Sequence, residues 1–221
     1  MTGSQESTIF TSLEGAKDWL VSELSCFETY DEGHRFPWDN YLWKSDKFRR
    51  AHLDVVDARD TKRLYMMHLT VFPHTDDGSP VFGFDLIAGP KKVTGAFHDF
   101  SPIDGDHKML LGFKERVAPM TWSKKRELPE WARNIFSDDM VSAGFITDVE
   151  ELESVIGLLK SNLQYYLSNV GERGDNDFTA AQNKYCFWQK KNPHTPKVMA
   201  ALGFTDEEVS RFIQECLFPE I

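Results

Sequence analysis

Two stretches of the chain carry apolar residues at the spacing of a helix. Such residues recur about every 3.6 positions from Leu13 to Phe27 and again from Leu152 to Val170. The sequence therefore predicts a helix over residues 12–27 and a second long helix that Gly171 ends. Three shorter helices are expected further on, one over Thr179–Lys191, one with Thr195 as its N-cap and Pro196 as its first residue that ends at Gly203, and one that starts with the capping box Thr205-x-x-Glu208.

Between residues 50 and 99 the pattern changes to short apolar runs separated by turn residues. The runs cover residues 51–56, 64–72, 81–87 and 92–98. Runs of this length and composition predict a four-stranded antiparallel meander. Strands followed by helices indicate an α+β fold in which helices cover the sheet. Two segments fit neither pattern. We expect the aromatic stretch 36–43 to be irregular, and residues 109–113 to be a further strand.

Composition limits the classes of protein that fit. The 221 residues are 41% hydrophobic, enough for one sizeable core, so we expect a single domain over residues 1–221. A net charge of -10 argues against a nucleic-acid partner. Three widely separated cysteines match neither a disulfide framework nor a zinc site, which fits a reducing compartment. No export signal or membrane-spanning apolar stretch is apparent, so we expect a cytoplasmic protein with no membrane partner.

Ionisable residues interrupt three of the predicted strands, namely Asp54, His68 and Asp85. If residues 74–79 close a symmetric hairpin, His68 lies directly across from Asp85 on the same face of the sheet. For the longer first hairpin, an even register puts Asp54 opposite or diagonal to His68, and an odd register puts it on the other face. The same reasoning through the turn at Gly89 sets Thr94 beside Asp85.

Three titratable groups on one patch suggest proton transfer. Burial raises the pKa of a carboxyl group and a neighbouring imidazolium lowers it, so the Asp85 and His68 pair is a candidate proton donor near neutral pH. The alternative is a buried Asp-His hydrogen bond that only satisfies two core residues. Nucleotide-binding, nucleophile-elbow and metalloprotease motifs are absent, and His52, His98 and His107 match no familiar metal-ligand spacing, so no metal is expected.

Basic residues form small clusters in this acidic chain. They are Lys91 and Lys92, then Lys124, Lys125 and Arg126, and then Lys190 and Lys191. Each cluster alone is most often a solvated face. Together they suit an acidic protein partner or the carboxylates of a substrate.

The sequence resembles one family, the ferredoxin-dependent bilin reductases, and within it the phycocyanobilin:ferredoxin oxidoreductase branch. Three ordered blocks carry the resemblance, which covers nearly the whole chain from about residue 20. They are His68-x-x-x-Phe72-Pro73 with Pro80-x-Phe82-Gly83-x-Asp85 and Val93-Thr94-x-x-x-x-Asp99-x-Ser101-Pro102, then Leu128-Pro129-x-Trp131-x-x-x-Ile135-Phe136-Ser137, and last Tyr185-Cys186-x-x-Gln189-Lys190-Lys191-Asn192-x-x-Thr195 with the closing Leu217-Phe218.

The resemblance implies a three-layer α/β/α sandwich that holds biliverdin between the sheet and the C-terminal helices. It implies no bound metal, flavin or nicotinamide, with single electrons arriving from reduced ferredoxin and protons coming from side chains. Residues matching His68 and Asp85 hold the proton shared with the bilin in that branch. A glutamate that helps to reduce the outer vinyl group corresponds here to Asp54.

This sequence departs from the branch at three places. Asp54 is one methylene shorter than the glutamate, which bears on vinyl reduction. Pro193 and His194 replace an Asp-Lys pair, and the arginine that binds a propionate is replaced near Gly144. We therefore expect Thr94, Lys191 and His194 to contribute to substrate binding, and Lys91, Lys92, Lys124, Lys125 and Arg126 to dock ferredoxin.

The resemblance thus implies an oxidoreductase that converts biliverdin IXα to a phycobilin in four one-electron steps. We expect phycoerythrobilin, formed through 15,16-dihydrobiliverdin as in a similar phage-derived group, with phycocyanobilin as the alternative. The protein would act as a monomer and could pass its product to a phycobiliprotein lyase. Two other classes stay open, a bilin-binding protein or lyase that reduces nothing and an acid-base hydrolase, for which no nucleophile is identifiable.

Overall fold

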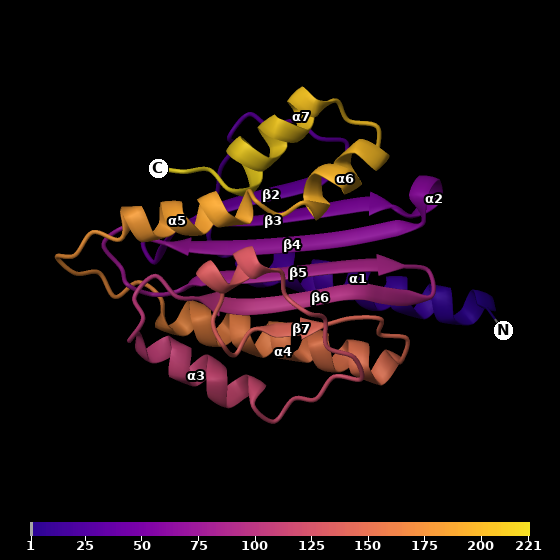
Figure 1. Cartoon of the computed structure of the whole chain (residues 1–221), viewed down its shortest axis with the longest axis horizontal. Helices are drawn as coiled ribbons and strands as arrows, with labels where there is room; N and C mark the ends of the chain where they lie inside the picture. The colour runs from indigo at the N-terminus through magenta and orange to yellow at the C-terminus, as the bar shows by residue number, and fades with distance from the viewer. Residues whose placement is uncertain (1) are drawn as a thin grey trace.

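Seven antiparallel strands lie side by side in one sheet, in the order in which they occur in the chain. The computed structural model describes residues 2–221, with side chains from residue 8 onward. Figure 1 shows the sheet between its helices. The strands are β1 (Glu28–Thr29), β2 (Asp39–Lys44), β3 (Phe48–Ala58), β4 (Leu64–Pro73), β5 (Val81–Gly89), β6 (Lys92–Ser101) and β7 (Val141–Ala143).

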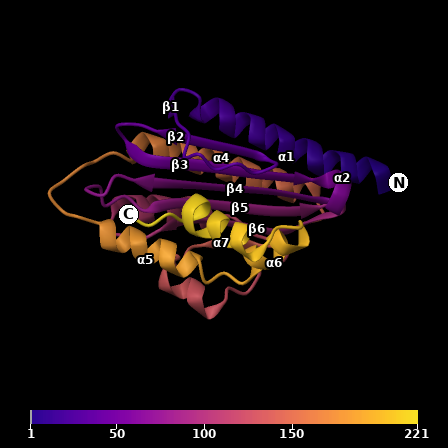
Figure 2. The same ribbon diagram turned by 90° about the horizontal axis from the view of Figure 1, so that it is seen from above.

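Helices cover both faces of this sheet, as the view from above makes plain (Figure 2). One face carries α1 (Thr2–Leu24), α3 (Lys108–Val117) and α4 (Val149–Asn169). The other face carries α5 (Thr179–Gln189), α6 (His194–Ala201), α7 (Asp206–Arg211) and two short turns of helix, Glu130–Asn134 and Phe212–Leu217. The small helix α2 (Arg59–Lys62) joins β3 to β4. The predicted three-layer α+β sandwich is confirmed, and no helix over residues 2–221 is long and apolar enough to cross a membrane.

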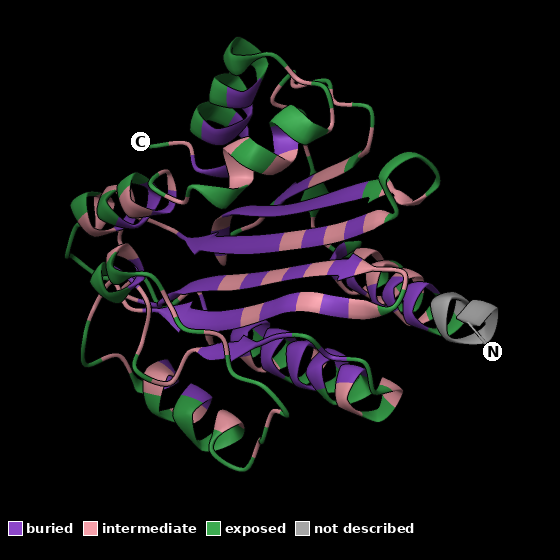
Figure 3. Cartoon of the chain, turned by 45° about the vertical axis from the view of Figure 1, so that its right-hand side comes forward, coloured by how far each residue is buried: buried purple, intermediate pink, exposed green. Residues whose placement is uncertain are grey.

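The two faces of the sheet differ in how well they are packed. The larger hydrophobic cluster joins α1 and α4 to alternate strand residues such as Leu53, Leu69 and Phe84. On the other face, residues in the middle of β4 and β5 are only half-buried, so buried and half-buried positions alternate along these strands (Figure 3). The period of two along a strand therefore separates a filled face from a partly open one.

The predicted register is confirmed for the hairpin of β4 and β5, where His68 faces Asp85. For the first hairpin, where an even and an odd register were both open, the structure has the even one, and Asp54 faces His68 across β3 and β4. The register for the third hairpin is wrong. Gly89 pairs with Lys92, so the turn lies further along the chain than expected, and a β-bulge between Ile87 and Ala88 shifts the pairing by one more residue. Asp85 therefore faces Phe97 rather than Thr94.

Several predicted elements also need correction. Residues 39–44 are a strand rather than an irregular segment, because Trp43 packs into the core between β1 and β3. Residues 109–113 lie in helix α3, where Met109 and Phe113 are four residues apart on the buried side. Helix α6 begins at His194, so Thr195 is not its N-cap. The capping box at Thr205 and Glu208 is confirmed at the start of α7.

We expect the filled face to supply most of the stability. Leu163 of α4 is fully buried, whereas Leu111 of α3 is 61% exposed. Leu163→Ala should lower the free energy of unfolding by about 2–5 kcal/mol, and the matched Leu111→Ala should change it by less than about 0.5 kcal/mol. Urea denaturation of both variants checks this, and equal effects would contradict the assignment of the core.

Candidate active site

Three adjacent strands bring Asp54, His68 and Asp85 into one row. Asp54 of β3 is directly opposite His68 of β4, which is directly opposite Asp85 of β5. Side chains opposite each other in antiparallel strands point to the same side of the sheet. The row therefore runs across the strands on the side of α5, α6 and α7.

The row faces a cavity of about 330 Å³ between the sheet and these helices. Asp54, His68 and Asp85 lie on its floor, and Phe212, Leu217 and Phe218 close it from the C-terminal side. The Phe218 ring meets the His68 ring edge-on, with 5.5 Å between centroids. A mainly apolar cavity with a few convergent polar groups is the usual form of a small-molecule site.

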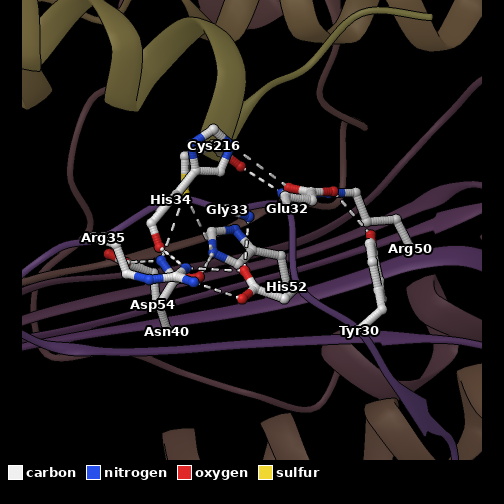
Figure 4. Close-up of polar contacts among 11 residues, drawn as sticks. Tyr30, Glu32, Gly33, His34, Arg35, Asn40, Arg50, His52, Asp54 and Cys216 are labelled. Carbon is white, nitrogen blue, oxygen red and sulfur yellow. Dashed lines mark hydrogen bonds and ion pairs between the residues drawn. The ribbon is translucent and has the colours of Figure 1, made fainter.

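Asp54 is held by a network of hydrogen bonds that continues away from the cavity (Figure 4). Trp38 donates to Asp54 Oδ1 at 2.6 Å and the Asn40 amide donates to the same oxygen at 3.1 Å. The Asn40 carbonyl oxygen lies 3.0 Å from His52 Nε2, so this nitrogen carries the proton and donates it. Both donors use one carboxyl oxygen, which leaves Oδ2 of Asp54 without a donor from the network.

A second buried network fixes the C-terminal segment above Asp54. Arg50 is 2% exposed and holds Glu32 through two hydrogen bonds of 3.0 and 2.9 Å. Its guanidinium also donates to the Cys216 carbonyl at 2.6 Å. The arginine thus ties β3 to the segment that roofs the cavity, as Figure 4 also shows.

Burial shifts the pKa of every member of the row toward its neutral form. It raises the pKa of Asp85 to about 7, against the charge of Arg126. It also raises the pKa of Asp54 to about 7, against the Trp38 and Asn40 hydrogen bonds. Burial lowers the pKa of His68 to about 4, so at neutral pH the imidazole is uncharged. Of the Asp85 and His68 pair that the sequence singled out, the carboxyl group is therefore the member that can hold a proton near neutral pH.

Asp99 also lines the cavity but is already satisfied. Its carboxylate accepts hydrogen bonds from the hydroxyl of Ser101 at 2.8 Å and from the backbone N–H of Ser137 at 3.0 Å. By contrast, no hydrogen bond to the Asp85 side chain is found within residues 8–221. Asp99 is a structural carboxylate, whereas Asp85 is free to meet a ligand.

The three residues expected to bind substrate are not equally placed. Thr94 and His194 line the cavity. The Thr94 hydroxyl donates a hydrogen bond to the Ile87 carbonyl oxygen at 3.0 Å. Lys191 is not part of the lining, and its ammonium lies 4.6 Å from the centre of the Phe187 ring.

The predicted docking residues divide into two groups. Lys92 and Lys124 lie 4.8 and 4.2 Å from the centre of the half-exposed Phe145 ring, and we call these three residues the basic rim. Lys91 and Lys125 are exposed nearby in sequence. Arg126, in contrast, lines the cavity.

Two residues of the site, Trp38 and Asn40, were not predicted from the sequence. Their only signal was that they lie in the aromatic stretch 36–43, just before β3.

Within the side chains described from residue 8, no group of three or more His, Cys, Asp or Glu residues is arranged to hold a metal ion. The apolar cavity with its row of ionisable residues is the candidate site. A family model described as ferredoxin-dependent bilin reductase matches residues 6–219. The chain belongs to this family. It is an oxidoreductase that takes its electrons from ferredoxin.

Individual relatives of this bilin reductase agree with that assignment. The chain is 27% identical to the phycocyanobilin:ferredoxin oxidoreductase of Gloeobacter violaceus over 90% of its own length and 80% of the relative's. It is 28% identical to that of Prochlorococcus marinus over 86% and 73% of the two lengths.

Two solved structures have the same fold. PcyX is 33% identical, with a TM-score of 0.66 over 95% of this chain and 99% of that chain. Phytochromobilin synthase from tomato, solved in complex with biliverdin, is 15% identical, with a TM-score of 0.70 over 94% and 82% of the two chains. The second likeness concerns the fold alone.

The raised pKa of Asp85 predicts a pH effect on stability. Between its pKa when unfolded and about 7, the folded protein binds more protons than the unfolded chain, so the free energy of unfolding falls as pH rises. Between pH 5 and pH 8 the free energy of unfolding of Asp85→Asn should therefore fall by about 2 kcal/mol less than that of the wild type. Denaturation curves across this range measure it. Asp175→Asn, at an exposed position, should keep the wild-type slope, and an unchanged slope in Asp85→Asn would contradict the raised pKa.

Proposed function

We propose that this bilin reductase converts biliverdin IXα to a phycobilin. The substrate gains four electrons from ferredoxin and four protons, so two double bonds become single bonds. The observation that carries the proposal is the row of Asp54, His68 and Asp85 on the floor of a large apolar cavity. Such a cavity suits a flat organic molecule, and the row supplies groups that hold protons at neutral pH.

Asp85 is the main proton donor in this proposal. Its pKa near 7 keeps the acid available at neutral pH and still allows it to release a proton to a reduced bilin. The neutral His68 beside it shares the proton between carboxyl group and substrate. Asp54 has a similar pKa, but Trp38 and Asn40 hold one of its oxygens and its side chain is short, so we assign it a secondary role.

The expected product is phycoerythrobilin, formed through 15,16-dihydrobiliverdin. An aspartate at position 54 reaches one methylene less far into the cavity than a glutamate would, which disfavours proton delivery to an outer vinyl group. Phycocyanobilin is the alternative product. The relatives called phycocyanobilin:ferredoxin oxidoreductases are 26–28% identical to this chain, an identity that leaves room for a different regiochemistry.

An anaerobic assay tests this function. The purified protein is mixed with biliverdin, reduced ferredoxin and a low-potential electron source, and the bilins are separated by chromatography against both phycobilin standards. We expect a coloured complex before ferredoxin is added and a phycobilin afterwards. Binding without any reduction would instead identify a bilin carrier, and turnover with NADPH alone would contradict electron supply by ferredoxin.

Replacing the proton donors should stop the reaction after electron transfer has begun. Asp85→Asn and His68→Gln keep the shape of the site but remove its titrating groups, so turnover should fall by about 10²–10⁴-fold while biliverdin still binds. A long-lived bilin radical should then be visible by electron paramagnetic resonance.

Asp54→Asn serves as the matched comparison. It should lose less than about tenfold, because Asp85 and His68 remain. If Asp54→Asn is as inactive as Asp85→Asn, the three residues act as a triad and the pair assignment is wrong. Asp54→Glu should not switch the product by itself, since regiochemistry also depends on how the rings lie in the cavity.

The basic rim is the proposed docking site for ferredoxin. Gly144 donates to the Lys124 carbonyl and Ile146 exchanges two hydrogen bonds of 2.9 Å with Val93, so the backbone on both sides of Phe145 is fixed. Phe145 itself has a φ of 58°, an uncommon conformation for an aromatic residue, and its ring is 41% exposed between the two lysines. An apolar ring inside a cationic border suits a small acidic protein.

Charge reversal at the rim should slow electron delivery alone. Lys124→Glu should raise the KM for ferredoxin several-fold at low salt, with a smaller difference at high salt, where charges are screened. Biliverdin affinity should stay at the wild-type value. Lys114→Glu, the same change on the exposed side of α3, is the control and should leave the KM unchanged. Loss of biliverdin binding in Lys124→Glu would assign the rim to the substrate instead.

A further inference from the structure

The side chain of Arg126 enters the cavity from a backbone that is held in place. Its N–H donates to the Ser142 carbonyl at 2.9 Å, and its carbonyl accepts the Ser142 hydroxyl at 2.8 Å. The neighbouring Lys125 forms a β-bridge with Ala143. The backbone of this segment is thus held against β7 on both sides of Lys125, and the direction in which Arg126 leaves the backbone is fixed.

Two glycines make room for this side chain. A Cβ atom on Gly144 would lie 2.6 and 2.7 Å from Cδ and Cγ of Arg126, which is closer than real contacts allow. A Cβ atom on Gly95 would lie 3.1 Å from Nη1 of Arg126 and 2.7 Å from the Phe97 ring. Neither glycine has a positive φ, so the backbone conformation does not require glycine at these positions. What requires glycine is space. At Gly144 the space is taken by the Arg126 side chain and the Thr94 carbonyl, and at Gly95 it is taken by the Phe97 ring and the tip of Arg126.

Most N–H groups of the Arg126 guanidinium have no acceptor among the described side chains and backbone around it. Nη1 donates to the Thr94 carbonyl at 3.2 Å, and the group lies 5.6 Å from the centre of the Phe97 ring. Among the side chains of residues 8–221, no carboxylate forms an ion pair with it. Arg50, in contrast, is paired with Glu32 and a carbonyl. A half-buried arginine has five N–H donors, and here most of them stay available on the wall of the cavity.

We propose that Arg126 is the cation that binds a carboxylate of the substrate, in a slot that Gly95 and Gly144 leave open. The proposal rests on the proposed function, because a bilin carries two propionate side chains and needs cations to orient it. Arginine binds a carboxylate with two parallel hydrogen bonds, which fixes both the position and the angle of the group. The carboxylate then determines which part of the bilin lies over Asp85.

This arrangement also connects binding to protonation. The positive charge of Arg126 opposes the effect of burial on the pKa of Asp85. A substrate carboxylate on Arg126 would offset that charge and favour the protonated form of Asp85. Binding of the anionic substrate would thus prepare the proton donor.

Binding of biliverdin and of its dimethyl ester distinguishes this role from a structural one. The ester keeps the tetrapyrrole but has no carboxylates. Arg126→Gln should weaken biliverdin binding by about tenfold or more and change ester binding by less than about twofold. Lys125→Gln, the matched control at the exposed neighbour, should change neither. Dissociation constants come from absorbance titrations without ferredoxin.

Gly144→Ala gives an independent check, because the added methyl group displaces Arg126 without removing its charge. It should reproduce the loss seen in Arg126→Gln, and the double variant should be no weaker than either single one. Equal losses for acid and ester in Arg126→Gln, or no loss at all, would overturn the proposal. Should Gly144→Ala not fold, the comparison of acid and ester in Arg126→Gln still decides. If the wild type binds neither compound, the proposed function itself fails.

Discussion

The pairing register of β3, β4 and β5 is the constraint on which the site depends. Each of these strands contributes one ionisable residue to the row, and the register sets Asp54, His68 and Asp85 side by side. A shift of one residue in any strand would turn its side chain to the face filled by α1 and α4, where Leu53, Leu69 and Phe84 pack. The large apolar residues next to the three polar ones therefore enforce the alignment, since the wrong register would place a polar group in the apolar core and turn a core residue toward the cavity.

The sheet divides stability and chemistry between its two faces. Burial keeps Asp54 and Asp85 protonated well above the usual range and holds His68 neutral, and each of these shifts costs folding free energy. The cost is offset on the opposite face, where the core is continuous. The indole of Trp38 and the amide of Asn40 satisfy Asp54 only partly, which keeps one of its oxygens available.

Local sequence signals predicted the parts of the fold that local rules govern. Turn residues at the tip of the β4–β5 hairpin were enough to place His68 opposite Asp85, and the capping box at Thr205 marked the start of α7. The partner of Asp85 on β6 was missed for two reasons. The turn closes with Gly89 paired to Lys92 rather than around Gly89 and Pro90, and no turn residue marks the bulge at Ile87 that shifts the pairing by one more residue. Strand β2 was hidden because Leu42 and Trp43, neighbours on opposite faces, are both apolar and buried, which removes the alternation that identifies a strand. The position of Arg126 depends on contacts with β7 and on space at Gly144, which no local pattern contains.

The same two segments connect the basic rim to the cavity. On β6, Lys92 lies against Phe145 at the surface, and Thr94, two residues further on, lines the cavity. In the segment beside β7, Lys124 lies against the same ring, and Arg126 reaches the cavity wall. Each segment thus passes from the rim to the cavity within a few residues. If ferredoxin docks on the rim as proposed, it would sit next to the wall that carries Arg126, and the row of Asp54, His68 and Asp85 would supply protons from the floor. Electrons and protons would then reach the bilin from different sides, so the docked ferredoxin would not block the residues that donate protons.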